Sequence, residues 1–236
     1  MNNAPEFSGS GDPIYRHTPP ATPAPRAIGD SENIERIARH IATHLGPVTT
    51  VFHELVSTDV HIDVHIVAPT ADRPFYTLVT SGMSDRAMTV PTGAEHLAYA
   101  ELALCLPPDW PMTDADWQDE NNYWPIRALK TLARFPHEYQ TWLCLDHTVP
   151  HGNPATPYAP DCPFSCALLS TANTAPLEFA TLVLSPQKTI YFFGVVFIYP
   201  EELQFKLESG AEPLVEALET MGHCELVDLA REGVIE

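Results

Sequence analysis

Ten consecutive residues, from Ile190 to Tyr199, are apolar or aromatic apart from Gly194, and this run constrains the fold more than any other feature. A strand with one exposed face alternates between apolar and polar residues, whereas a strand that is covered on both faces reads as a continuous apolar run. The run is also too short for a membrane-spanning helix, which needs about 18 apolar residues. The sequence therefore predicts a central strand in a covered sheet.

Shorter segments with a period of two predict further strands at residues 48–55, 61–67, 75–80, 101–106, 165–169 and 179–184. A helical period after Asp30 predicts a helix that ends at Gly46-Pro47. Prolines suited to the first helical position predict helices that begin near Pro125 and Pro200, and Gly210 separates the latter from another helix. Strands and helices are therefore interleaved along the chain.

The first 29 residues contain six prolines among Gly, Ser and Thr, so they cannot sustain a helix or a central strand. We interpret residues 1–29 as a flexible arm and residues 30–236 as one domain. Residues 147–163 contain five prolines and show no periodicity, which predicts a long loop and a candidate binding element.

The chain carries 31 Asp and Glu against 12 Lys and Arg, a formal net charge of -19. Such a charge repels phosphate backbones and anionic lipids, so we expect neither a nucleic-acid nor a membrane partner. It favours a basic protein partner instead. The five cysteines are an odd number in a chain with no recognisable signal peptide, which indicates reduced thiols and a cytoplasmic location.

Few residues suggest catalysis. His61, Asp63 and His65 alternate along one predicted strand, and with His147 they could line a cleft in a metal-dependent or hydrolytic enzyme. Side chains two residues apart on a strand are about 6 to 7 Å apart at the backbone, however, so they do not converge on one ion unaided. Enzymatic activity is therefore the alternative hypothesis, and we expect no cofactor. Ser84, in a Gly-Met-Ser sequence, is expected in a turn because Arg86 replaces the second glycine of a nucleophile elbow.

A series of short motifs gives a more specific indication. They are the segments 75–85 and 101–107, Trp124-Pro125, Asp146-His147, and the segments 193–197, 201–203 and 227–233. In this order and spacing, they resemble the suppressor of fused domain family over residues 30–236. The resemblance implies an α/β (α+β) domain with a mixed central sheet and flanking helices, and protein binding rather than catalysis.

In animal members, such a domain and a second one clamp an extended peptide of a transcription factor. Single-domain bacterial members resemble immunity proteins that neutralise a toxin, or bind other client proteins. We therefore expect a non-enzymatic domain that binds a basic toxin or client polypeptide. Family positions and the expected acidic rim with aromatic anchors give the candidate partner-binding residues Tyr76, Asp85, Arg86, Met88, Glu95, Tyr99, Glu101 and His147. Tyr76 and Tyr99 are expected to be exposed.

Overall fold

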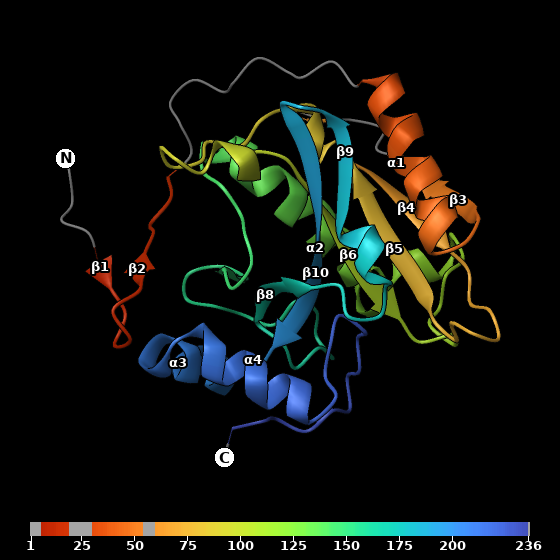
Figure 1. Cartoon of the computed structure of the whole chain (residues 1–236). Coiled ribbons are helices and arrows are strands. Elements are labelled where there is room, and N and C mark those ends of the chain that lie inside the picture. Colours follow the sequence, from red (N-terminus) through yellow and green to blue (C-terminus); the bar gives the residue numbers. More distant parts are fainter. Residues whose placement is uncertain (1–5, 19–29, 54–59, 236) are drawn as a thin grey trace.

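The computed structural model describes residues 6–18, 30–53 and 60–235 (Figure 1). Within these residues, eight strands form one sheet, in which β9 (Thr181–Ser185) pairs with β10 and the other seven follow one order. That order is β3 (Val48–Phe52), β4 (Asp63–Val67), β5 (Tyr76–Ser81), β6 (Ala100–Leu106), β10 (Lys188–Ile198), β8 (Cys166–Thr171) and β7 (Thr148–Pro150). Among the described strands of this sheet, β6 and β10 pair in parallel and the other pairs are antiparallel, so the sheet is mixed, as predicted.

The apolar run forms β10, which connects the two halves of the sheet. Its residues from Tyr191 to Gly194 pair with β6, and those from Phe193 to Ile198 pair with β8. A Cβ atom on Gly194 would lie 2.7 Å from the carbonyl oxygen of Thr171, where β8 ends. A side chain at this position would therefore force the two strands apart, and the glycine permits their close approach.

Helices cover both faces of the sheet (Figure 1). Alternate residues of β6 separate the two sides: Leu102 and Leu104 pack in the cluster under α2 (Glu120–Glu138), while Ala103 packs in the cluster under α1 (Ser31–His44). α4 (Ala211–Thr220) packs against β8 and β10 through Leu214 and Leu218. The continuous apolar character of the inner strands follows from this double cover.

α1 begins as the sequence predicts. The side chain of Asp30 accepts hydrogen bonds from the backbone N–H groups of Glu32 and Asn33, which satisfies two of the donors that a helix start leaves free. Asp30→Ala should lower the free energy of unfolding by about 1 kcal/mol. Glu35→Ala, on the exposed side of the same helix, should change it by less than about 0.5 kcal/mol. Urea unfolding of both variants measures the difference, and equal stabilities would show that the cap contributes nothing.

α2 begins five residues earlier than predicted. Asp119 caps the helix by accepting a hydrogen bond from the backbone N–H of Asn121, so Pro125 lies within the helix rather than at its first position. The proline lacks an N–H group, and α2 accommodates it in its second turn. The aspartate was a better indicator of the helix start than the proline.

The N-terminal part of the chain forms a two-stranded hairpin of β1 (Glu6–Phe7) and β2 (Pro13–Ile14), which an ion pair between Arg16 and Glu6 closes at 3.0 Å. The backbone N–H of Ser10 donates to the carbonyl oxygen of Leu207 at the end of α3 (Pro200–Ser209). The division between an arm and a domain at residue 30 stays a prediction. Among the described helices, none is both long and apolar enough to cross a bilayer.

Candidate protein-binding surface

The predicted motif around Gly82 forms a tight turn after β5. Gly82 has a φ angle of +105°, and a Cβ atom there would lie 1.8 Å from the backbone oxygen of His61. Only glycine fits this turn, which leads into the short helix η1 (Met83–Asp85). Ser84 is buried in it, as a turn residue, as the sequence predicts.

The carboxylate of Glu101 stabilises this turn through hydrogen bonds. Its Oε1 atom accepts hydrogen bonds from the backbone N–H of Gly82 at 3.1 Å and of Ser84 at 2.9 Å, and from the Ser84 hydroxyl at 2.7 Å. Its Oε2 atom accepts from the Thr80 hydroxyl at 2.6 Å. The side chain is fully buried, and this burial raises the pKa of Glu101 to about 7 in spite of the four donors. Glu101 is therefore an internal support of the turn.

Asp85, at the end of η1, joins the turn to α1. Its side chain accepts hydrogen bonds from the Asn33 amide at 2.6 Å and from the backbone N–H of Asp30 at 3.1 Å. Partial burial raises the pKa of Asp85, while these hydrogen bonds and the charge of Lys188 act in the opposite direction. The Lys188 ammonium lies 4.9 Å from the centre of the Tyr99 ring.

The short helix η2 (Glu95–Leu97) lies beside β10 and adds the exposed Glu95 to this region. We call Asp85, Glu95, Tyr99 and Lys188 the Asp85 surface. It combines two carboxylates with a half-buried aromatic ring. It also contains a lysine that sequence reasoning missed, although Lys188 lies only two residues before the apolar run.

The other predicted contact residues lie elsewhere or are inaccessible. Arg86 follows η1 and is half-buried, whereas Met88 and Glu101 are buried. Tyr76 is at the opposite end of β5 from the turn and packs against the main core. The expectation of exposed tyrosines is wrong, because Tyr76 and Tyr99 are both half-buried and pack against the core.

The residues of the enzymatic alternative do not form one site. The carboxylate of Asp63 lies 3.0 Å from His61 and 3.1 Å from His53, but His65 pairs with the Ser81 hydroxyl instead. His147 packs edge-on against Trp142, beside β7 at the far side of the sheet from β4. Within residues 6–18, 30–53 and 60–235, no three His, Cys, Asp or Glu side chains are arranged to hold a metal ion.

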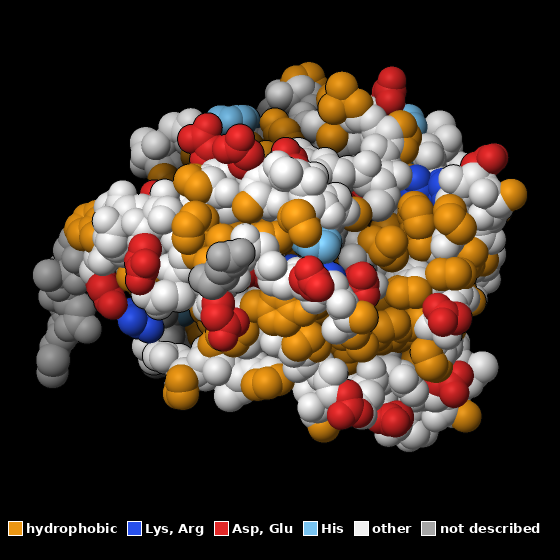
Figure 2. Space-filling model, turned by 90° about the horizontal axis from the view of Figure 1, so that it is seen from below, with side chains coloured by type: hydrophobic (Ala, Val, Ile, Leu, Met, Phe, Trp, Pro, Cys, Tyr) orange, Lys and Arg blue, Asp and Glu red, His pale blue; other side chains and the backbone are white. Residues whose placement is uncertain are grey.

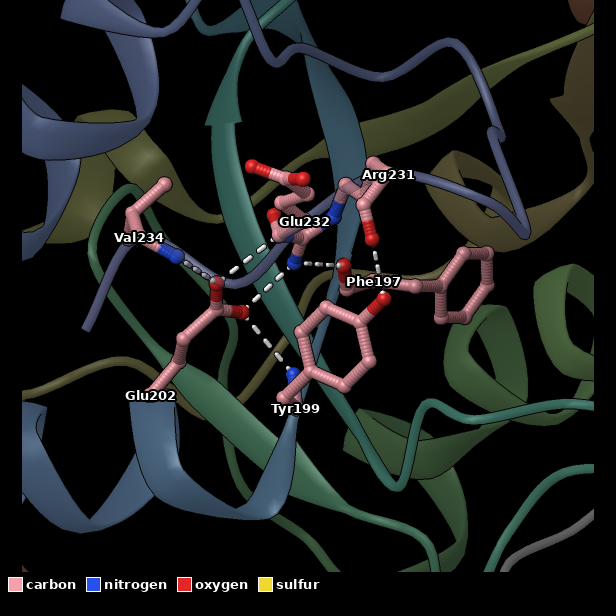
Figure 3. A network of polar contacts seen from close by, with 6 residues as sticks. All are labelled: Phe197, Tyr199, Glu202, Arg231, Glu232 and Val234. Atoms are coloured by element: carbon pink, nitrogen blue, oxygen red, sulfur yellow. Dashed lines mark hydrogen bonds and ion pairs between the residues drawn. The ribbon is translucent and has the colours of Figure 1, made fainter. Parts of the chain in front are cut away.

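The sequence motifs did not reveal a buried ion pair at the other end of β10, where Glu202 in α3 faces Arg231 near the C-terminus (Figure 3). Arg231 donates to both carboxylate oxygens of Glu202 and to the carbonyl oxygen of Phe197. Glu202 also accepts from the backbone N–H groups of Tyr199 and Val234. Burial alone would raise the pKa of Glu202, but Arg231 and the backbone donors hold it below its ordinary value.

Beside Arg231 there is a small, shallow hollow, lined by Phe164, Val195, Phe197 and residues 224–228. Pockets that hold small molecules usually measure about 300 to 1,000 Å³, whereas this hollow has room for about one water molecule. It is therefore too small for a ligand or an inserted side chain. All five cysteines are free thiols, and Trp124 is completely buried, as the sequence predicts.

Comparison with solved structures identifies the same fold in three relatives. A suppressor of fused homologue from Neisseria gonorrhoeae FA 1090 is 18% identical, with a TM-score of 0.64 over 88% of this chain and 99% of that one. A chain of the Sufu-Fu complex is 15% identical, with a TM-score of 0.59 over 89% of this chain and 93% of that one. Drosophila Suppressor of Fused is 13% identical, with a TM-score of 0.57, and the match covers 85% of this chain but 50% of the relative.

A search of curated protein sequences finds no match. The sequence model of the family described as "Suppressor of fused protein (SUFU)" matches residues 58–232, which is most of the chain. The match begins before β4 and ends just after Arg231, so it includes the Gly82 turn, Glu101 and the buried ion pair. This chain belongs to the suppressor of fused family.

Proposed function

We propose that this protein is a non-enzymatic binding domain whose partner is a protein with a basic surface. The family supports a binding role, since one solved relative is described as a Sufu-Fu complex. The observation that carries the proposal is the net charge of -19 on this fold. Charge of one sign attracts partners of the opposite sign and accelerates their encounter.

The more specific form of the proposal is immunity, in which the protein binds and neutralises a basic toxin in the cytoplasm. The five free thiols support a reducing compartment. Co-expression tests this form once a partner is known: growth should stop when the partner is produced alone and recover when this protein accompanies it. A partner that does not affect growth would instead be a client.

Affinity capture from the native lysate at low salt tests the binding function itself. We expect one basic polypeptide in stoichiometric amount, which a high-salt wash releases because surface charge interactions are screened. Mass spectrometry identifies it. If the folded protein captures no polypeptide from a lysate of cells that express the expected client, the binding proposal is wrong.

The Asp85 surface makes a specific prediction about the association rate. Glu95→Lys should slow association with the captured polypeptide about tenfold, because it replaces an attractive charge with a repulsive one on an exposed side chain. Stopped-flow fluorescence measures the rate. Asp114→Lys makes the same change in net charge on the loop before α2 and serves as the control. Equal rates for the two variants would remove the Asp85 surface from the binding site.

A further inference from the structure

The end of the molecule that carries the C-terminus has a second candidate surface. α3, α4 and residues 221–235 form this C-terminal face, at the bottom of Figure 1. Figure 2 looks onto it and shows apolar side chains in a band, with acidic side chains on both sides. The apolar side chains that these segments leave exposed or half-buried include Leu203, Val215, Met221, Leu229 and Val234, and Met221 is 54% exposed.

The C-terminal face is held in place from within. Leu214 and Leu218 fix α4 against β8 and β10. The ion pair between Glu202 and Arg231, with the hydrogen bond from Val234 to Glu202, fixes the last described residues to α3 (Figure 3). A partner would therefore meet a preformed surface, and binding would not have to order this part of the chain.

The exposed Asp, Glu, Lys and Arg side chains of α4 and residues 221–235 are all acidic, while α3 contributes the half-buried Lys206 as well as acidic residues. Glu212, Glu216 and Glu219 lie four and three residues apart, so they share the solvent side of α4. Asp228 and Glu232 add two exposed carboxylates from the C-terminal segment. None of the five takes part in an ion pair with another described residue. The charges are thus available to an incoming cation.

We infer that the C-terminal face binds a basic amphipathic segment of a partner protein, with apolar side chains on the band and Lys or Arg toward the carboxylates. This inference rests on the proposed binding function and adds a second surface to it. A second copy of this chain is a poor occupant, because two such faces would bring their carboxylates together.

The two surfaces are far enough apart for separate tests. The Asp85 surface includes Lys188 at the first residue of β10, and the C-terminal face begins just after its last residue, Ile198. A strand of this length spans roughly 30 Å at about 3.3 Å per residue. A substitution on one surface should therefore leave direct contacts at the other unchanged.

A synthetic helical peptide of leucine and lysine, with its leucines on one side, is a suitable probe for the full-length protein. Fluorescence anisotropy should show binding that weakens about tenfold in Met221→Lys and in Glu216→Lys. Methyl NMR spectra should show shifts at Val215 and Met221. A scrambled peptide of the same composition should bind about tenfold more weakly, because its leucines no longer share a face.

Val183→Lys is the matched control, since Val183 is 64% exposed on β9, away from this face. It should leave the affinity for the peptide unchanged. No binding, equal loss in Val183→Lys and Met221→Lys, or methyl shifts confined to Leu97 in η2, beside the Asp85 surface, would each overturn the inference. Capture of a natural partner in spite of that result would leave the proposed function standing without this second surface.

Discussion

Glu202→Ala is expected to lower the free energy of unfolding by about 3 to 5 kcal/mol, the range for removing one partner of a buried ion pair. The variant leaves the Arg231 guanidinium buried without its carboxylate. It also removes the acceptor for the backbone N–H groups of Tyr199 and Val234 (Figure 3). Urea unfolding, followed by tryptophan fluorescence, measures the loss.

Glu201→Ala is the control, because Glu201 is exposed in the same turn of α3 and should change stability by less than about 0.5 kcal/mol. The double variant Glu202→Leu and Arg231→Met should recover part of the loss, since apolar residues of similar volume often replace a buried ion pair well. A loss below about 1 kcal/mol in Glu202→Ala would show that the pair is solvated and does not hold the C-terminal segment.

The second large effect concerns pH and Glu101. Burial raises the pKa of this carboxyl from 4.5 to about 7 in the folded protein, so the folded state binds a proton more tightly than the unfolded state. Between pH 4.5 and about pH 7, the folded state carries more protons than the unfolded state, so the free energy of unfolding falls as pH rises. Across this window, the contribution of Glu101 changes by on the order of 3 kcal/mol, at about 1.4 kcal/mol per pH unit.

Glu101→Gln should remove this pH dependence. Glutamine keeps an acceptor for Gly82 and Ser84 and can donate to the Thr80 hydroxyl, as a protonated glutamate would. We therefore expect the variant to be as stable as the parent near pH 4.5 and more stable near pH 7. Glu95→Gln, at an exposed position, is the control. If the free energy of unfolding depends on pH in the same way in the parent and in Glu101→Gln, the raised pKa of Glu101 is contradicted.

Much of the fold follows from the period of the sequence. The apolar run predicts β10 as a strand covered on both faces, because only double cover removes the polar alternation. The helical period, Asp30 and Gly46 predict α1 almost to the residue. The sequence predicts the start of α2 five residues too late, because it does not distinguish a proline at the first helical position from one in the second turn.

The site was less predictable, because it depends on contacts between distant residues. Glu101 and Asp85 appear in the family motif, but nothing in the sequence shows that one is buried and the other half-exposed. Glu202 and Arg231 are 29 residues apart and meet only because α3 and the C-terminal segment leave the same end of the sheet. A charged pair of this kind has no periodic signal, whereas the net charge is evident from composition alone.

The proposed function depends most on attraction between this acidic protein and a basic partner. The most direct test is the association rate constant of the captured polypeptide, measured by stopped flow from low to physiological ionic strength. Electrostatic steering predicts a fall of about tenfold or more, with a much smaller change in the dissociation rate. An association rate that does not change with salt would contradict a charge-guided binding function.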